Sequence, residues 1–215
     1  MSQFTLAVTM KTQVKICGVT SVADAQAAAG AGADLIGLMF YEGSPRHVTI
    51  AQAVEISRAL PPFVLRVGVF VNPDETLVTR AIAECGLSLL QFHGDEDSAF
   101  CTQFGLMSMK AVRMRDAESL NLLENYHTEA FLLDAYSQAG LGGTGEKFNW
   151  DLAVAAQKYG KPIFLAGGLT PENVTNAVRL VRPFAVDVSS GVESAPGKKD
   201  AAKVRDFIAA VRRCE

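Results

Sequence analysis

Cys17 stands where a thiol can meet a ligand. It ends the apolar run 14–17 and is followed at once by Gly18 and by a helix-start signal at Thr20. A thiol at the C-terminal tip of a strand can face the loops of the fold, where its thiolate acts as a base or a nucleophile. The alternative is an inert cysteine that behaves as a small buried hydrophobe, which is the common role of this residue type.

Three other side chains are candidates for acid–base chemistry or ligand binding. Asp134 ends the apolar run 131–134, where a carboxylate needs a partner or a proton; it is either an acid or base, or the cap of a turn. Arg46 follows Ser44-Pro45 in a predicted loop. Its planar guanidinium group either binds a second anion or is merely solvated. His93 can hydrogen-bond a substrate, although we favour a turn-stabilising histidine capped by Asp95.

Two segments rich in glycine and serine predict a phosphate site. They follow the apolar runs 163–166 and 185–188. Backbone N–H groups and hydroxyl groups bind phosphate in such loops, whereas tight turns alone explain one glycine more easily than both segments. Another glycine-rich segment, 142–145, is interpreted as a flap over the ligand or as a plain flexible loop. The candidate binding residues are Gly143, Gly167, Gly168, Ser189, Ser190 and Gly191.

Eight short apolar runs must position these residues. Most are continuous rather than alternating, which is typical of parallel strands covered on both faces. Amphipathic stretches lie between them, and no G-x-G-x-x-G segment follows the first run, so the pattern favours a single (β/α)8 barrel over an open doubly wound sheet. In a barrel the C-terminal strand ends form the active face, which collects the candidates at one mouth. The predicted strands are 14–17, 35–39, 65–71, 89–92, 107–111, 131–134, 163–166 and 185–188.

Helix boundaries are predicted from capping residues. Side chains that accept the free N–H groups of a first turn begin helices, and glycines in the left-handed conformation end them. The helix near 117–125 is expected to be the weakest. The expected starts are Thr49, Asp74, Thr170 and Asp200, and the expected stops are Gly30, Gly86, Gly105 and Gly160.

Composition argues against several classes of protein. The chain has 215 residues, 49% of them hydrophobic, which is enough for a hydrophobic core that needs no disulfide or structural metal. Its four cysteines lack metal-site spacing and the density of a disulfide scaffold, which favours the reducing cytoplasm. The net charge is −3 and the basic residues are scattered along the sequence, so the sequence indicates no basic patch of the kind that binds nucleic acid or an anionic membrane. We expect residues 1–12 to be a short N-terminal extension, without a signal peptide, to one catalytic domain at 13–215.

Seven ordered motifs together resemble one enzyme family. The family is phosphoribosylanthranilate isomerase, of tryptophan biosynthesis, and the resemblance covers essentially the whole chain after residue 12. Any one of the motifs is weak by itself, but their order along the chain is specific. The motifs are 15–20, 44–46, 68–72, 91–95, 133–134 with 142–145, 165–169 and 186–193.

The resemblance implies a reaction and roles for three residues. The reaction is the Amadori rearrangement of N-(5-phosphoribosyl)anthranilate to 1-(2-carboxyphenylamino)-1-deoxyribulose 5-phosphate, with no cofactor and no metal. It implies Cys17 as general base, Asp134 as general acid and Arg46 beside the anthranilate carboxylate. The implied partner is a small phosphorylated substrate, and a monomer is expected. The alternatives are an isomerase of histidine biosynthesis, which is expected to use two aspartates and no strand-one cysteine, and a barrel that binds a phosphorylated ligand without turnover.

These roles require Cys17 ionised and Asp134 protonated at the same time. We expect burial to keep the proton on Asp134. We expect Lys15, nearby N–H groups or the helix beginning near Thr20 to lower the pKa of Cys17.

Overall fold

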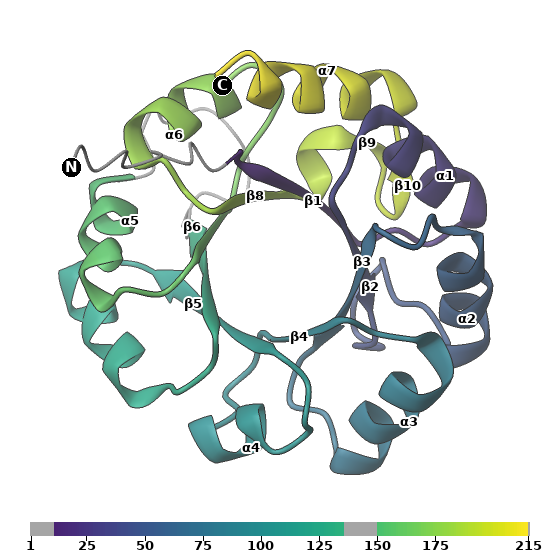
Figure 1. Cartoon of the computed structure of the whole chain (residues 1–215), viewed down its shortest axis with the longest axis horizontal. Helices are drawn as coiled ribbons and strands as arrows, with labels where there is room; N and C mark the ends of the chain where they lie inside the picture. Colours follow the sequence, from purple (N-terminus) through teal and green to yellow (C-terminus); the bar gives the residue numbers. More distant parts are fainter. Residues whose placement is uncertain (1–10, 136–149, 215) are drawn as a thin grey trace, which may run out of the picture.

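A computed structural model describes residues 11–135 and 150–214, and these form a closed barrel of eight parallel strands. The strands follow chain order around the ring, and β8 pairs with β1 to close it (Figure 1). The (β/α)8 barrel predicted from the apolar runs is confirmed. The strands are β1 (Gln13–Cys17), β2 (Leu35–Met39), β3 (Leu65–Phe70), β4 (Leu89–Phe92), β5 (Ser108–Met114), β6 (Ala130–Ala135), β7 (Ile163–Ala166) and β8 (Ala185–Val188).

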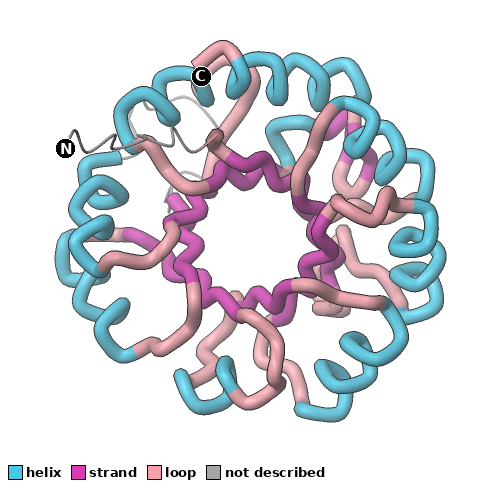
Figure 2. The backbone as a smooth tube through the Cα atoms, viewed as in Figure 1, coloured by secondary structure: helices cyan, strands magenta, loops and turns pink. Residues whose placement is uncertain are grey.

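Helices surround the ring of strands (Figure 2). In the described ranges they alternate with the strands, and a short antiparallel hairpin follows β8. The predicted weak helix is a 3-10 helix, η1 (Ala117–Asn125). The others are α1 (Val22–Ala31), α2 (Ile50–Ala59), α3 (Glu75–Cys85), α4 (Ser98–Thr102), α5 (Trp150–Ala156), η2 (Gln157–Tyr159), α6 (Val174–Val181), η3 (Ser190–Val192) and α7 (Ala201–Arg212), and the hairpin is β9 (Glu193–Ala195) with β10 (Lys198–Lys199).

Two apolar layers hold the barrel together. Successive strand residues point to opposite faces, so each strand contributes to both layers. On β1, Ile16 packs in the larger layer between strands and helices, and Cys17 belongs to the smaller cluster inside the ring. Lys15 is two residues from Cys17 and shares its inward face. A lysine therefore lies inside the barrel, directly beneath the thiol.

Three of the four predicted helix starts are confirmed as caps, and the fourth is wrong. Thr49, Asp74 and Asp200 cap α2, α3 and α7 as predicted. The expected start at Thr170 is wrong, because α6 begins at Val174 after Asn173. The Asn173 Oδ1 atom instead accepts a hydrogen bond from the Thr170 N–H at 2.8 Å.

The start of α1 also differs from the expected signal at Thr20. Ser21 is the cap of this helix and accepts from the Asp24 N–H. Thr20 donates its hydroxyl to the Gly197 carbonyl at 2.6 Å, which ties the end of β1 to the hairpin after β8. Thr20 thus joins two parts of the barrel mouth rather than beginning a helix.

Two of the four predicted helix stops are wrong. Gly86 and Gly160 end α3 and η2 in the left-handed conformation, as expected. Gly30 lies inside α1, which ends at Gly32, and α4 ends at Gln103, before Gly105. Within 11–135 and 150–214, no helix has the length and apolar character needed to cross a bilayer.

Candidate active site

Cys17 ends β1 at the mouth of the barrel, with 7% of its surface exposed. Its neighbour in register on β2 is Gly37. A Cβ atom on Gly37 would lie 2.9 Å from the Cys17 Sγ and 3.1 Å from the Lys15 Nζ, so the glycine leaves room for both groups. The thiol and the ammonium therefore converge on one small space, as the expected contribution of Lys15 requires.

The expected lowering of the Cys17 pKa is wrong. Burial raises the pKa of the Cys17 thiol above its ordinary value, because the thiolate loses its hydration. The Lys15 ammonium acts in the opposite direction but does not outweigh burial. The thiolate is thus the minor form at neutral pH, and its fraction grows as the pH rises toward the raised pKa.

Asp134 is the penultimate residue of β6, on the inner side of the mouth and in register with Arg113 on β5. Its side chain is 31% exposed, so the expected burial of this carboxylate is not found. Its Oδ2 atom lies 3.4 Å from the His93 Nε2. Asp134 meets an imidazole and solvent rather than an apolar pocket.

His93 follows β4 and is held by Gln91, not by Asp95. The Gln91 Nε2 and the His93 Nδ1 are 3.0 Å apart, and the Asp95 N–H donates to Asn72 Oδ1 instead. The favoured interpretation of His93 as a turn residue capped by Asp95 is wrong. The other ring nitrogen of His93, Nε2, is on the side of Asp134.

Arg46 lies over the turn after Cys17, but its guanidinium group is already hydrogen-bonded to Glu193. The Nε and Nη2 atoms donate to the Glu193 carboxylate at 2.8 and 2.6 Å, and Glu193 also accepts from Lys199 at 2.8 Å. Hydrogen bonding to Glu193 raises the pKa of Arg46. A Cβ on Gly18 would lie 2.5 Å from the Arg46 Cδ, so the glycine lets the arginine stem cross the loop. The guanidinium group therefore has only its remaining N–H groups free for a second anion.

The two predicted phosphate loops lie side by side. Gly167 and Gly168 have φ values of 86° and 63°, which favour glycine. A Cβ on Gly191 would clash with the Leu169 carbonyl oxygen, so the loop after β8 packs directly on the loop after β7. Ser190 is exposed and begins η3. The structure thus brings together the predicted phosphate residues. Gly143, the predicted binding residue of the flap segment 142–145, lies outside the described residues.

Sequence reasoning missed Asp187, Lys199 and Gln91. Lys199 is on the unpredicted hairpin and donates to the Ser189 carbonyl at 3.2 Å, below the phosphate loops. Gln91 and Asp187 are polar residues inside apolar strands, with 1% and 8% of their surfaces exposed. That interruption of an apolar run was a usable signal for both, whereas nothing in the sequence distinguished Lys199 from a solvated surface lysine.

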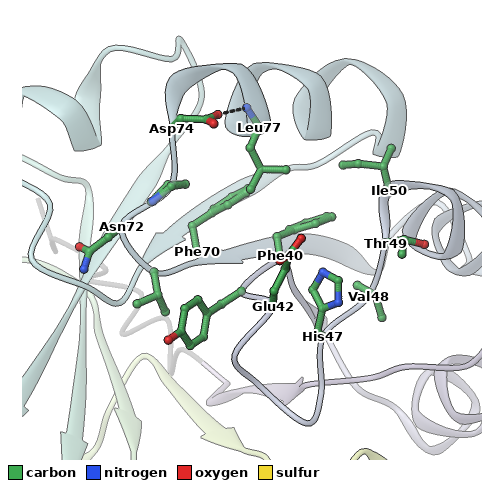
Figure 3. Close-up of a pocket in the computed structure, with 13 residues that line it drawn as sticks. Phe40, Glu42, His47, Val48, Thr49, Ile50, Phe70, Asn72, Asp74 and Leu77 are labelled. Atoms are coloured by element: carbon green, nitrogen blue, oxygen red, sulfur yellow. Dashed lines mark hydrogen bonds between the residues drawn. The ribbon is translucent and has the colours of Figure 1, made fainter.

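A cavity of about 460 Å³ lies between the loops that lead into α2 and α3 (Figure 3). Phe40, Phe70, Ile50 and Leu77 are among its lining residues. Cys17, Asp134 and the phosphate loops do not line it, so we place the chemistry at those groups and not in this cavity. Across 11–135 and 150–214, no three His, Cys, Asp or Glu side chains are grouped as a metal site.

Comparison with known sequences gives one consistent family. The model of the N-(5'phosphoribosyl)anthranilate (PRA) isomerase family matches residues 14–210. Proteins named N-(5'-phosphoribosyl)anthranilate isomerase from Geobacter metallireducens and Geobacter sulfurreducens are each 54% identical to this chain over 196 residues. Each match covers 91% of this chain and 96% of the relative.

Solved structures agree with the sequence comparison. Phosphoribosyl anthranilate isomerase from Thermotoga maritima has a TM-score of 0.88 at 39% identity, over 94% of this chain and 99% of that one. A phosphoribosyl anthranilate isomerase in complex with reduced 1-(o-carboxyphenylamino)-1-deoxyribulose 5-phosphate has a TM-score of 0.85 at 38% identity, with the same coverage. Since the motifs, the barrel and both comparisons agree, the chain belongs to the N-(5'-phosphoribosyl)anthranilate isomerase family of tryptophan biosynthesis.

Proposed function

We propose that Cys17 is the general base and Asp134 the general acid of the Amadori rearrangement. Protonation of the furanose ring oxygen by Asp134 opens the sugar to a Schiff base. Removal of the C2 proton by the Cys17 thiolate then gives an enolamine, which tautomerises to the ketose. The observation that supports this proposal is that the thiol and the carboxylate lie at the C-terminal ends of β1 and β6 in one closed barrel, both on the inner side of the same mouth.

The remaining candidates are proposed to bind and orient the substrate. The phosphate lies against the N–H groups and hydroxyls of the loops after β7 and β8, which pack on each other. Arg46, held by Glu193 over the turn after Cys17, meets the anthranilate carboxylate. His93, which lies between Gln91 and Asp134, is proposed to hydrogen-bond the substrate beside Asp134. Gly143 stays a proposed binding residue of the loop after β6.

Growth without tryptophan tests the proposed function. The gene should restore growth to a strain that lacks the isomerase, and the same gene with Cys17→Ala should not. Purified protein should convert N-(5-phosphoribosyl)anthranilate without added metal or cofactor. Turnover of the histidine-pathway aminoaldose alone would support the histidine-biosynthesis alternative, and ligand binding without turnover would support the non-catalytic barrel.

Arg46→Ala is expected to reduce kcat/KM by roughly 10- to 100-fold, because a charge-assisted contact to a carboxylate contributes about 1.5–3 kcal/mol. Inhibition by inorganic phosphate should be unchanged, since the phosphate loops are intact. Arg46→Lys is the matched control: it keeps the charge but not the two-pronged contact, so it should recover only part of the loss. If Arg46→Ala abolished phosphate inhibition, Arg46 would belong to the phosphate site instead.

Gly168→Val is expected to weaken product binding by roughly 10- to 100-fold, because its side chain would block the approach of the phosphate to backbone N–H groups. The φ of 63° adds strain, which Gly105→Val controls: Gly105 has a φ of 69°, has equally open surroundings and lies in the loop before β5, at the opposite end of the barrel. Titration calorimetry with product should separate the two variants. Equal affinities would remove the loop after β7 from the binding site.

We also propose a monomeric protein of the cytoplasm, with residues 1–12 as an extension to a catalytic domain at 13–215. The four cysteines are free, which supports a reducing compartment, and β1 begins at Gln13. Against a monomer stand three exposed apolar side chains near the N-terminal strand ends, Phe63, Leu65 and Met107. Light scattering at micromolar concentration decides this point, and a dimer mass there would replace the monomer.

A further inference from the structure

A buried ion pair lies inside the barrel beneath Cys17. The Lys15 Nζ is 2.8 Å from the Asp187 Oδ1, and the two side chains are 0% and 10% exposed. Lys15 on β1 and Asp187 on β8 are partners in register at the seam that closes the barrel. The sequence predicted an influence of Lys15 on the Cys17 pKa but gave Asp187 no role.

Stability alone is a poor explanation for this pair. Taking two charges out of water is costly, and replacing a buried ion pair by apolar side chains is often neutral or stabilising. The surrounding inner positions are apolar, among them Leu35 and Ala185. The interior of the barrel could therefore accommodate apolar residues here, and a charged pair calls for another explanation.

The position of the ammonium supplies that explanation. It lies between a carboxylate on one side and the Cys17 thiol on the other, over the space that Gly37 leaves open. Burial is the largest influence on the pKa of Lys15 and acts to lower it, but Asp187 and Cys17 together outweigh burial and raise the pKa, so the lysine is a cation at neutral pH. A fixed cation beside a buried thiol stabilises the thiolate that the thiol forms.

We propose that Lys15 and Asp187 are positioning residues for Cys17: the Lys15 ammonium holds the thiolate, and Asp187 fixes the ammonium and offsets part of its charge. The proposal rests on the proposed role of Cys17 as base. Neither residue needs to touch the substrate. When the thiol loses its proton, the cluster carries one cation and two anions, so Lys15 and Asp187 act on the thiolate with opposite signs.

Two other charged groups face Cys17 and must be kept constant in a test. Lys199 of β10 stabilises the thiolate electrostatically, and Arg46 also interacts with it. Both are held by Glu193 and are independent of the Lys15–Asp187 pair. Among the other cysteines, burial raises the pKa of Cys85 to about 11 and that of Cys101 to about 12, so their thiolates contribute little below those values.

The test is the ionisation of Cys17 in two variants, followed by the ultraviolet absorbance of the thiolate against pH in a Cys214→Ser background. Lys15→Met should raise the Cys17 pKa by about one unit or more, a tenfold loss of thiolate at a given pH. Asp187→Asn, which keeps the shape of the side chain, should lower it, because Lys15 then acts on the thiolate without its counter-charge. The rising limb of kcat/KM against pH should move in the same two directions.

The matched control is Lys110→Met. Lys110 is also a buried lysine in an ion pair, 2.8 Å from Glu96, but it points away from the interior of the barrel. This variant should lose stability and leave the ionisation of Cys17 unchanged. If Lys15→Met fails to fold, the variant that combines it with Asp187→Asn removes both charges, and its Cys17 pKa should exceed that of Asp187→Asn alone.

Shifts of Cys17 ionisation in the same direction for both charge variants, or shifts no larger than that of Lys110→Met, would overturn the proposal. Opposite shifts in ionisation that leave the pH profile of turnover unmoved would have a different meaning. They would confirm the link between the ion pair and Cys17, and they would contradict the assignment of Cys17 as the base.

Discussion

Cys17→Ala should lower kcat by about 10³-fold or more, since a positioned general base contributes roughly 10²–10⁴-fold to proton transfer. The loss should appear in kcat rather than in product affinity, because the phosphate loops and Arg46 are untouched. The variant removes one small buried atom at a strand tip, so its Tm should stay within about 4 °C of wild type, the shift that roughly 1 kcal/mol gives at this chain length. Steady-state kinetics and thermal melting check both statements.

Cys101→Ala is the matched control for this variant. Cys101 is fully buried in α4 and packs in the layer between the strands and the helices, outside the ring of strands. Its loss should cost comparable stability and leave turnover at the wild-type level. Activity of Cys17→Ala near that of the control would contradict the assignment of the base.

Asp134→Asn should lower kcat by about 10²-fold or more while keeping product affinity within a few fold. The amide has the shape of the carboxyl group but no acidic proton for the ring oxygen. Asp134 is 31% exposed and lies 3.4 Å from His93, so the substitution leaves no buried charge unpaired and the fold should be unaffected. Single-turnover kinetics together with product titration would distinguish a lost chemical step from lost binding.

Asp95→Asn is the control for Asp134→Asn. Asp95 is an exposed carboxylate in the loop after β4, and the contact that holds it uses its backbone N–H. Its variant should keep full activity. A weakened product affinity in Asp134→Asn with normal single-turnover rates would move Asp134 from the chemistry to substrate binding.

The strands were predictable because burial on both faces leaves a direct trace in the sequence. Continuous apolar runs such as 35–39 and 163–166 coincide with β2 and β7. The start of α1 was not predictable by the same means. Thr20 and Ser21 are adjacent hydroxyl residues with the same capping ability, and only the position of Gly197, 177 residues away, decides which of them caps the helix.

The site was predictable as a set of positions but not as a set of contacts. A barrel places every C-terminal strand end at one mouth, so Cys17 and Asp134 could be assigned to it from their places in the strands. Their neighbours depend on register and on side-chain direction. The Arg46 fork is bound to a glutamate 147 residues away, and the ionisation of Cys17 is opposed by burial that no local pattern measures.

We expect the pairing of β8 with β1 to be a late step when the chain refolds. Lys15 and Asp187 are 172 residues apart and meet only when the first strand is joined to the last. Contacts at such long separation form late, because the entropy of closing the intervening chain is lost before the contact contributes any stability. Helix content and part of the sheet can therefore return early in a refolding experiment, before the Lys15–Asp187 pair has formed beneath Cys17. Recovery of isomerase activity would then report the moment at which the two ends of the chain meet.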